Sequence, residues 1–153
     1  MVHEIDKSAV VTAVNEAYTQ YAKTTEGQNA SYIPYLKNIP PSLFGISVCM
    51  ADGERIEVGD TGYCFGIESV SKVPTAILAM KQHGTQTVMK KIGADATGLP
   101  FNSIIAILLE NDHPSTPLVN AGAITACSMI APTGNSDAKW LAIKGFVESL
   151  CGS

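Results

Sequence analysis

The sequence predicts an α+β fold that is mostly helical, with a β-hairpin in its N-terminal half. A short apolar, β-branched run over residues 44–50 is followed by Asp52-Gly53, a pair that strongly favours a tight hairpin turn. Several longer stretches carry apolar residues at three- and four-residue spacing, which is the pattern of amphipathic helices. Proline and glycine residues separate these stretches, so we expect short elements joined by frequent turns.

The composition is that of a globular protein. Of the 153 residues, 46% are hydrophobic and 16% are charged, which is enough apolar material for the core of one ordinary domain. The net charge is -4, and lysine and arginine do not cluster, so no nucleic-acid-binding surface is expected. No apolar run is long enough to span a bilayer, so we expect no membrane association.

Cysteine, histidine and glycine residues form no recognisable cofactor site. The four cysteines contain no CxxC pair, and no histidine follows at the spacing of a zinc ligand, so no metal is expected. Gly59, Gly62 and Gly66 lack the spacing of a dinucleotide fingerprint, so no cofactor of that class is expected either. The N-terminal residues carry neither the basic nor the apolar segment of a signal peptide, which favours a cytoplasmic protein with reduced thiols.

The first element is expected to be an amphipathic helix from about Asp6 to Ala22. Asp6 or Ser8 can act as its N-cap, because a short polar side chain accepts a hydrogen bond from the free amides of the first turn. Polar residues 24–28 break the pattern, and Gly27 is the expected stop. The apolar side chains at helical spacing, which we expect to face the core, are Val10, Val14, Ala17, Tyr18 and Tyr21.

The hairpin is the next expected element. Residues 44–50 form its first strand, and residues 55–58 alternate polar and apolar side chains, as a half-buried return strand does. Asp52-Gly53 is expected to form a two-residue turn between the strands.

A helix is then expected from Ser69 to about Gln82. Pro74 fits a helix only near its first turn, where the backbone amides have no partners, and this places Ser69 at the helix entrance. The side chains expected to face the core are Val73, Ile77 and Met80.

Four further elements complete the expected fold. Short helices are expected at residues 86–91 and 137–150, and a buried helix of small residues at 121–130. Residues 104–109 are expected to be buried, as helix or strand, because they are almost entirely apolar. In the last helix, Trp140, Phe146 and Leu150 are expected to pack against neighbouring elements.

Ser69-Val70-Ser71-Lys72 is a Ser-x-x-Lys motif. On a helix, residues three apart lie on one face about one turn apart, so Lys72 can reach the hydroxyl of Ser69. A serine hydroxyl needs a base to act as a nucleophile, and a lysine amine serves when burial and a helix N-terminus favour its neutral form. The alternative for the motif alone is a helix cap followed by a solvated lysine. The order of hairpin, glycine-rich loop and serine at a helix start favours catalysis, because serine β-lactamases and penicillin-binding proteins share it.

Several further segments, in the same order and at fitting separations, make the stretch from Tyr32 to Ile124 resemble the serine-dependent glutaminase family. That family shares the serine β-lactamase-like fold. The resemblance covers most of the chain. The matching pieces are Tyr32-Ile33-Pro34-x-Leu36, Phe44 to Cys49, Asp52-Gly53, Gly59-Asp60, Ser69-x-x-Lys72, Gly98-x-Pro100-Phe101-Asn102 and Pro117 to Ala123.

The resemblance implies hydrolysis of L-glutamine to glutamate and ammonia through an acyl-enzyme. It makes Ser69 the nucleophile, Lys72 the base, and Tyr32 a hydroxyl near the reacting groups. It also implies that Asn120 binds the amino-acid end of the substrate and that position 68 contacts the substrate. Taken alone, Tyr32 is better interpreted as a core aromatic residue, and Asn120 as the N-cap of the helix that follows it; the family resemblance favours the site for both.

Position 68 departs from the family pattern. The family usually has glutamine immediately before the serine, where this chain has Glu68. A carboxylate at this position would repel a substrate carboxylate. It is also expected to pair with Lys72 at i,i+4 spacing and to hold that lysine protonated.

Family catalytic domains are about twice as long as this chain. Residues 1–153 are therefore expected to be the N-terminal portion of a single glutaminase-like domain, a partial β-lactamase-like fold that lacks the C-terminal half of the sheet. Three functions remain open: a truncated glutaminase, a catalytically inactive remnant that acts through a complementing chain, and, less favoured, a penicillin-binding or β-lactamase-like acyl transferase. The resemblance also implies a homo-oligomer.

Overall fold

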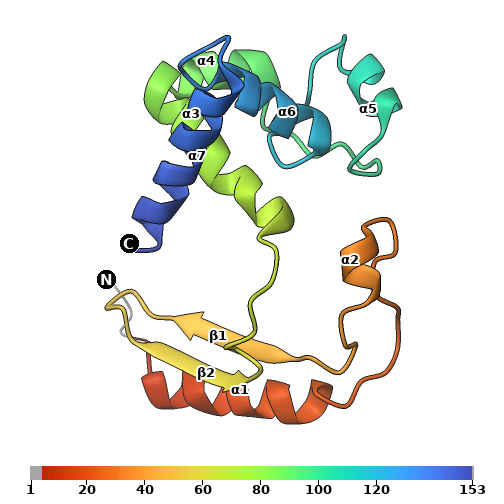
Figure 1. The fold of residues 1–153 in the computed structure, drawn as a ribbon, viewed down its shortest axis with the longest axis vertical. Coiled ribbons are helices and arrows are strands. Elements are labelled where there is room, and N and C mark those ends of the chain that lie inside the picture. Colours follow the sequence, from red (N-terminus) through yellow and green to blue (C-terminus); the bar gives the residue numbers. More distant parts are fainter. Residues whose placement is uncertain (1–4, 153) are drawn as a thin grey trace. The chain divides into compact units, whose positions relative to one another are not determined.

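A computed structural model describes residues 5–152 and divides the chain into two compact units, with the boundary between Phe65 and Gly66. The first unit contains the β-hairpin and two helices, and the second is entirely helical (Figure 1). This confirms the mostly helical α+β class with one hairpin. No helix within the described residues is long and apolar enough to cross a membrane.

In the first unit, helix α1 lies along the hairpin (Figure 1). Val14 of α1 is buried, and the ring of Tyr18 stacks on that of Phe44 with 5.5 Å between centroids. These contacts form the small core of this unit. Its elements are α1 (Lys7–Tyr21), α2 (Pro34–Lys37), β1 (Gly45–Cys49) and β2 (Arg55–Gly59).

Helix α1 begins and ends within one residue of the predicted bounds, Asp6 and Ala22. The Asp6 carboxylate accepts a hydrogen bond from the Ser8 amide at 2.9 Å, so Asp6 is the cap. The helix stops at Tyr21, because the following residues 22–28 contain no large apolar side chain to extend the buried stripe. The expected stop at Gly27 is wrong, as is the expected burial of Tyr21, whose side chain is exposed.

The hairpin is confirmed, with strands paired in antiparallel register from Gly45–Gly59 to Cys49–Arg55. Its turn is one residue longer than predicted. The Met50 amide donates to the Glu54 carbonyl at 2.8 Å, and the Gly53 amide donates to the Met50 carbonyl at 2.9 Å. The loop is therefore residues 51–53, and its last position, Gly53, has a φ of 89° that suits glycine.

Lys7, at the start of α1, joins the helix to this turn. Its Nζ lies 2.8 Å from Asp52 Oδ2 and also donates to Glu54. The hydrogen bond from Lys7 is the main cause that lowers the pKa of Asp52. All of these side chains are exposed, so salt screens the attraction.

Acid should weaken this attachment. The pKa of Asp52 is lower in the folded chain than in the unfolded chain, so ionised Asp52 stabilises the folded state above its ordinary pKa of about 4. That stabilisation is lost as the pH falls through the lowered, folded-state pKa. In thermal melts from about pH 5 to about pH 2, the unfolding temperature should fall more steeply in the parent than in Asp52→Asn. Parallel curves would contradict this account.

In the second unit, helix α3 packs against α4, α6 and α7 (Figure 1). The predicted helices at 69–82, 86–91, 121–130 and 137–150 are present. The core consists of Ala79, Val88, Ile92, Ala126, Met129 and Ile130. The elements are a 3-10 turn η1 (Glu68–Ser71), α3 (Lys72–His83), α4 (Thr85–Ile92), α5 (Ile104–Leu109), α6 (Asn120–Met129) and α7 (Ser136–Leu150).

The buried face of α3 differs from the predicted one. Thr75, Ala76 and Ala79 are buried, whereas Val73 and Ile77 are 49% and 38% exposed. Small side chains let two helices approach closely, and those of α3 meet the small residues of α6. The expectation that Val73 and Ile77 face the core of this chain is wrong.

Two further burial predictions are wrong. Residues 104–109 form helix α5, but Ile104 and Leu109 are at least 70% exposed, and only Ala106 is buried. Trp140 and Leu150 of α7 are also exposed, while Phe146 is partly covered and lies under Lys81 Nζ, 5.1 Å from the ring centroid. Apolar composition predicts which side chains favour burial, but burial also requires an element packed over them.

Gly122 fixes the first turn of α6 against the loop that precedes it. A Cβ at this position would lie 1.9 Å from the Thr116 carbonyl oxygen and 3.0 Å from the Ile92 side chain. The backbone of α6 can approach this closely only because residue 122 has no side chain.

Alanine at position 122 should therefore destabilise the chain. Gly122→Ala should lower the free energy of unfolding by about 1–3 kcal/mol, the usual range for overpacking. Gly145→Ala is the matched control, because α7 is open around that position and alanine should raise the free energy by about 0.5–1 kcal/mol. Urea denaturation of both variants measures the difference. A Gly122→Ala chain as stable as the parent would show that the contact relaxes without cost.

Candidate active site

The start of α3 and one face of α6 line a pocket of about 520 Å³. Four of the five predicted site residues are on its wall, namely Glu68, Ser69, Lys72 and Asn120. All four belong to the second unit, so this unit alone brings them together. The remaining lining residues are Ser71, Thr75, Ala123, Ile124 and Cys127.

Ser69 lies in the 3-10 turn that leads directly into α3, at the helix entrance that the sequence predicts. Two hydrogen bonds secure this turn: Ser71 Oγ donates to the Glu68 carbonyl at 2.6 Å, and Thr75 Oγ1 donates to the Ser71 carbonyl at 2.8 Å. Pro74 is the third residue of α3, in the first turn, where a helix tolerates proline.

Lys72 is the first residue of α3, and its amine points toward the start of α6. Nζ donates to Asn120 Oδ1 at 2.7 Å and to the Leu118 carbonyl at 3.2 Å. Between the described atoms of Lys72 and Ser69 there is no side-chain hydrogen bond, so the direct contact expected from i,i+3 spacing is not formed. Both side chains nevertheless line the same pocket.

Glu68 has a φ of 46°, in the left-handed region that residues other than glycine rarely adopt. This turns residue 68 out of the helical path, so the i,i+4 geometry with Lys72 does not apply. No ion pair between Glu68 and Lys72 occurs in the described structure, and the expected pairing is wrong. The Glu68 side chain is exposed and lies on the pocket wall.

Asn120 is the first residue of α6, and Val119 occupies the cap position. The interpretation of Asn120 as an N-cap is therefore wrong, and its side chain is available to the pocket. The backbone N–H of Asn120 donates to the Phe101 carbonyl at 3.0 Å, and this hydrogen bond links residues 100–103 to the start of α6.

Tyr32 belongs to the first unit, in the segment before α2. Its side chain is 77% exposed, so it is not the core aromatic residue that the alternative required. Its role in a site stays a prediction.

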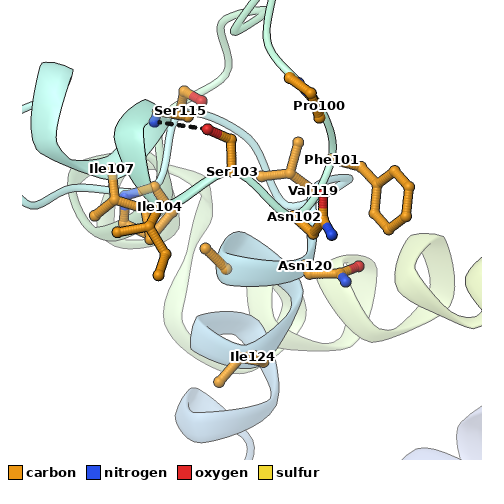
Figure 2. Close-up of a pocket in the computed structure, with 13 residues that line it drawn as sticks. Pro100, Phe101, Asn102, Ser103, Ile104, Ile107, Ser115, Val119, Asn120 and Ile124 are labelled. Carbon is orange, nitrogen blue, oxygen red and sulfur yellow. Dashed lines mark hydrogen bonds between the residues drawn. The ribbon is translucent and has the colours of Figure 1, made fainter.

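A second, smaller pocket of about 290 Å³ shares Asn120 and Ile124 with the first. Figure 2 shows it, with Ile104 and Ile107 from α5, Val119, Asn120 and Ile124 from the start of α6, and Phe101 beside them. Its wall is mainly apolar. The buried Ser115 hydroxyl on this wall has no hydrogen-bond partner among the described residues.

Sequence reasoning missed several residues of the first pocket wall. Ala123, Ile124 and Cys127 follow Asn120 by three, four and seven residues, and Thr75 follows Lys72 by three. Extending the helical period from the two motifs would have found them. Among residues 5–152, no group of three or more histidine, cysteine or acidic side chains could hold a metal ion.

Comparison with known proteins decides the family. The sequence profile described as Glutaminase matches residues 27–153. The chain belongs to the glutaminase family.

Glutaminases from Parabacteroides and Bacteroides species match almost the whole chain. The glutaminase of Parabacteroides distasonis is 62% identical over 97% of this chain and 48% of its own length, and that of Bacteroides thetaiotaomicron is 68% identical over 92% and 44%. The chain spans about half the length of these curated glutaminases.

Solved structures of glutaminases share the fold. One solved structure, described as a probable glutaminase, is 44% identical to this chain and has a TM-score of 0.90. The match covers 95% of this chain and 47% of the chain in that structure. The probable glutaminase of Bacillus subtilis has a TM-score of 0.76 at 30% identity, covering 95% and 43%. The described helices and hairpin thus correspond to about half of a glutaminase fold.

The left-handed backbone conformation of residue 68 can be tested separately from the charge of the Glu68 side chain. Because its φ is positive, Glu68→Gly should be more stable than Glu68→Ala by about 1 kcal/mol, the cost of a left-handed residue that carries a Cβ. At the open position 145 the order should be reversed, since alanine is favoured in an ordinary helix. Urea denaturation of the four chains gives both differences. If alanine is preferred at both positions, the left-handed conformation of Glu68 does not persist in solution.

Proposed function

We propose that this chain is the nucleophile-bearing portion of a serine-dependent glutaminase that hydrolyses L-glutamine to L-glutamate and ammonia. The observation that carries the proposal is the presence of Ser69, Lys72 and Asn120 on one pocket wall in a chain of the glutaminase family. A hydroxyl, an amine and an amide in one pocket supply a nucleophile, a base and a hydrogen-bonding group for a polar substrate.

In the proposed reaction, Ser69 Oγ attacks the carboxamide carbon of the glutamine side chain while Lys72 Nζ takes the hydroxyl proton. The carbon–nitrogen bond then breaks, the proton passes to the departing nitrogen, and ammonia leaves a glutamyl ester on Ser69. Water attacks the ester, releases glutamate and returns the proton to Ser69. In this proposal Asn120 binds the amino-acid end of glutamine, the residue 68 position contacts the substrate, and Tyr32 contributes its hydroxyl to the reaction.

We also propose that residues 1–153 are part of a single glutaminase domain whose site is completed by further residues. The curated relatives are about twice as long as the matched portion. We assign further substrate-binding residues and a hydrogen-bond donor that stabilises the oxyanion to the part of the glutaminase domain that this chain does not match. Loss of one such donor typically lowers kcat by about 100- to 1000-fold. The exposed Ile124 on the pocket wall supports a covering segment, as do the exposed Val73 and Ile77 of α3.

The chain alone should therefore show no significant glutaminase activity. Ammonia release from glutamine by the purified chain should equal that of its Ser69→Ala variant. Addition of the second half of the Parabacteroides distasonis glutaminase should restore turnover that depends on Ser69. Turnover by the chain alone, well above the Ser69→Ala control, would show that the site is already complete. No turnover in the mixture, with complex formation demonstrated, would contradict the proposal that this chain forms part of an active glutaminase.

The second candidate function is a catalytically inactive remnant that acts by binding a complementing chain. The Glu68 carboxylate on the pocket wall favours it, because this charge opposes a substrate carboxylate. Inactivity of the complemented parent, together with activity of complemented Glu68→Gln, would favour this function.

We infer a cytoplasmic location and a homo-oligomer for the complete protein. The location is supported by Cys49, Cys64, Cys127 and Cys151, which are all exposed free thiols. The oligomer is supported by exposed apolar residues such as Ile104 and Leu109 of α5. Size measurement of the complemented protein tests the oligomer.

A further inference from the structure

The contact between Lys72 and Asn120 gives Asn120 a role beyond substrate binding. We propose that Asn120 is a positioning residue for Lys72: its side-chain oxygen holds the lysine amine in the pocket that contains Ser69, and its amide nitrogen is left to donate to the substrate. This inference rests on the proposed function in one respect, because it takes Lys72 as the base.

The donor and acceptor chemistry of the two side chains fixes their orientation. A lysine ammonium has three N–H donors and no acceptor, so the atom of Asn120 that faces it must be the oxygen. Nζ lies 2.7 Å from that oxygen and 3.2 Å from the Leu118 carbonyl, which uses two of the three donors. When Lys72 gives up its third proton to act as the base, both contacts can remain, and its lone pair and the Asn120 side-chain nitrogen are left for the pocket.

Asn120 is itself held firmly. Its backbone amide donates to the Phe101 carbonyl at 3.0 Å, and the close approach at Gly122 fixes the same turn of α6 against the Thr116 carbonyl. An acceptor whose backbone cannot move holds its partner at a defined place, which is what preorganisation of a base requires.

The chemical nature of the acceptor also suits a base. A carboxylate in contact with Lys72 would favour the protonated amine, whereas an amide oxygen holds the amine without adding a negative charge. Glu68, the acidic residue on this wall, makes no ion pair with Lys72 in the described structure. The neutral Asn120 and Leu118 oxygens therefore orient Lys72 in place of a carboxylate.

The test follows the Lys72 amine in the 153-residue chain and needs no turnover. The chain is produced with lysine labelled with ¹³C and ¹⁵N, which leaves the amine unmodified, and the Lys72 Cε–Nζ resonance is assigned by its loss in Lys72→Arg. In Asn120→Asp the new carboxylate contacts the amine, so the pH midpoint of this resonance should rise by about one unit relative to the parent. Asn102→Asp is the matched control, because it adds the same charge on a neighbouring segment without a described contact to Lys72, and its midpoint should stay near that of the parent.

Equal midpoints in Asn120→Asp and Asn102→Asp would overturn the inference. A merely structural role of Asn120 would lower the unfolding temperature of its variants and leave the Lys72 midpoint unchanged. If Asn120→Asp does not fold, the contact is tested with Asn120→Leu, which has no side-chain acceptor. The Lys72 resonance of that variant should move toward the resonances of the exposed lysines. An unchanged Lys72 resonance would refute the contact. Because no step measures ammonia, failure here is distinct from failure of the proposed glutaminase activity.

Discussion

The candidate site depends on the close approach of the first turn of α6 to the loop before it. Gly122 has no side chain, and this lets the α6 backbone lie against the Thr116 carbonyl. The same turn carries Asn120, whose side chain reaches Lys72, and the preceding loop carries the Leu118 carbonyl, which is the second acceptor for Lys72. One backbone contact thus sets the position of both oxygen atoms that hold the lysine.

A second constraint acts on the other side of the pocket. The 3-10 turn and the left-handed Glu68 place Ser69 before the regular helix, whereas Lys72 begins the helix proper. Ser71 and Thr75 hydroxyls bind backbone carbonyls of this turn and so stabilise a conformation that a continuous α-helix would not contain. Strain of this kind recurs at functional sites, where surrounding hydrogen bonds maintain it.

Much of the fold could be predicted from local patterns, because turn chemistry and helical period act over a few residues. Asp6 as a cap, the hairpin before Arg55 and the helix entrance at Ser69 all follow from such rules. Which face of each helix is buried could not be predicted in this way, because burial depends on which elements are present to cover that face. Val73, Trp140 and two isoleucines of α5, Ile104 and Ile105, are apolar but exposed for this reason.

The candidate site was likewise predictable only in part. The motifs supplied Ser69, Lys72 and Asn120, but i,i+3 spacing could not reveal that Lys72 turns toward α6, since its acceptors lie 46 and 48 residues further along the chain. Nor could spacing reveal the positive φ of Glu68, which breaks the helical geometry on which the expected pairing with Lys72 relied.

The boundary between the two compact units has a consequence for inheritance. It falls between Phe65 and Gly66, just before the turn that carries Ser69, so every hydrogen bond described around Ser69, Lys72 and Asn120 lies on one side of it. A genetic exchange at this joint would replace the segment that carries Tyr32 and leave those hydrogen bonds intact. The two parts can therefore diverge at different rates, while Ser69, Lys72 and Asn120 are inherited together.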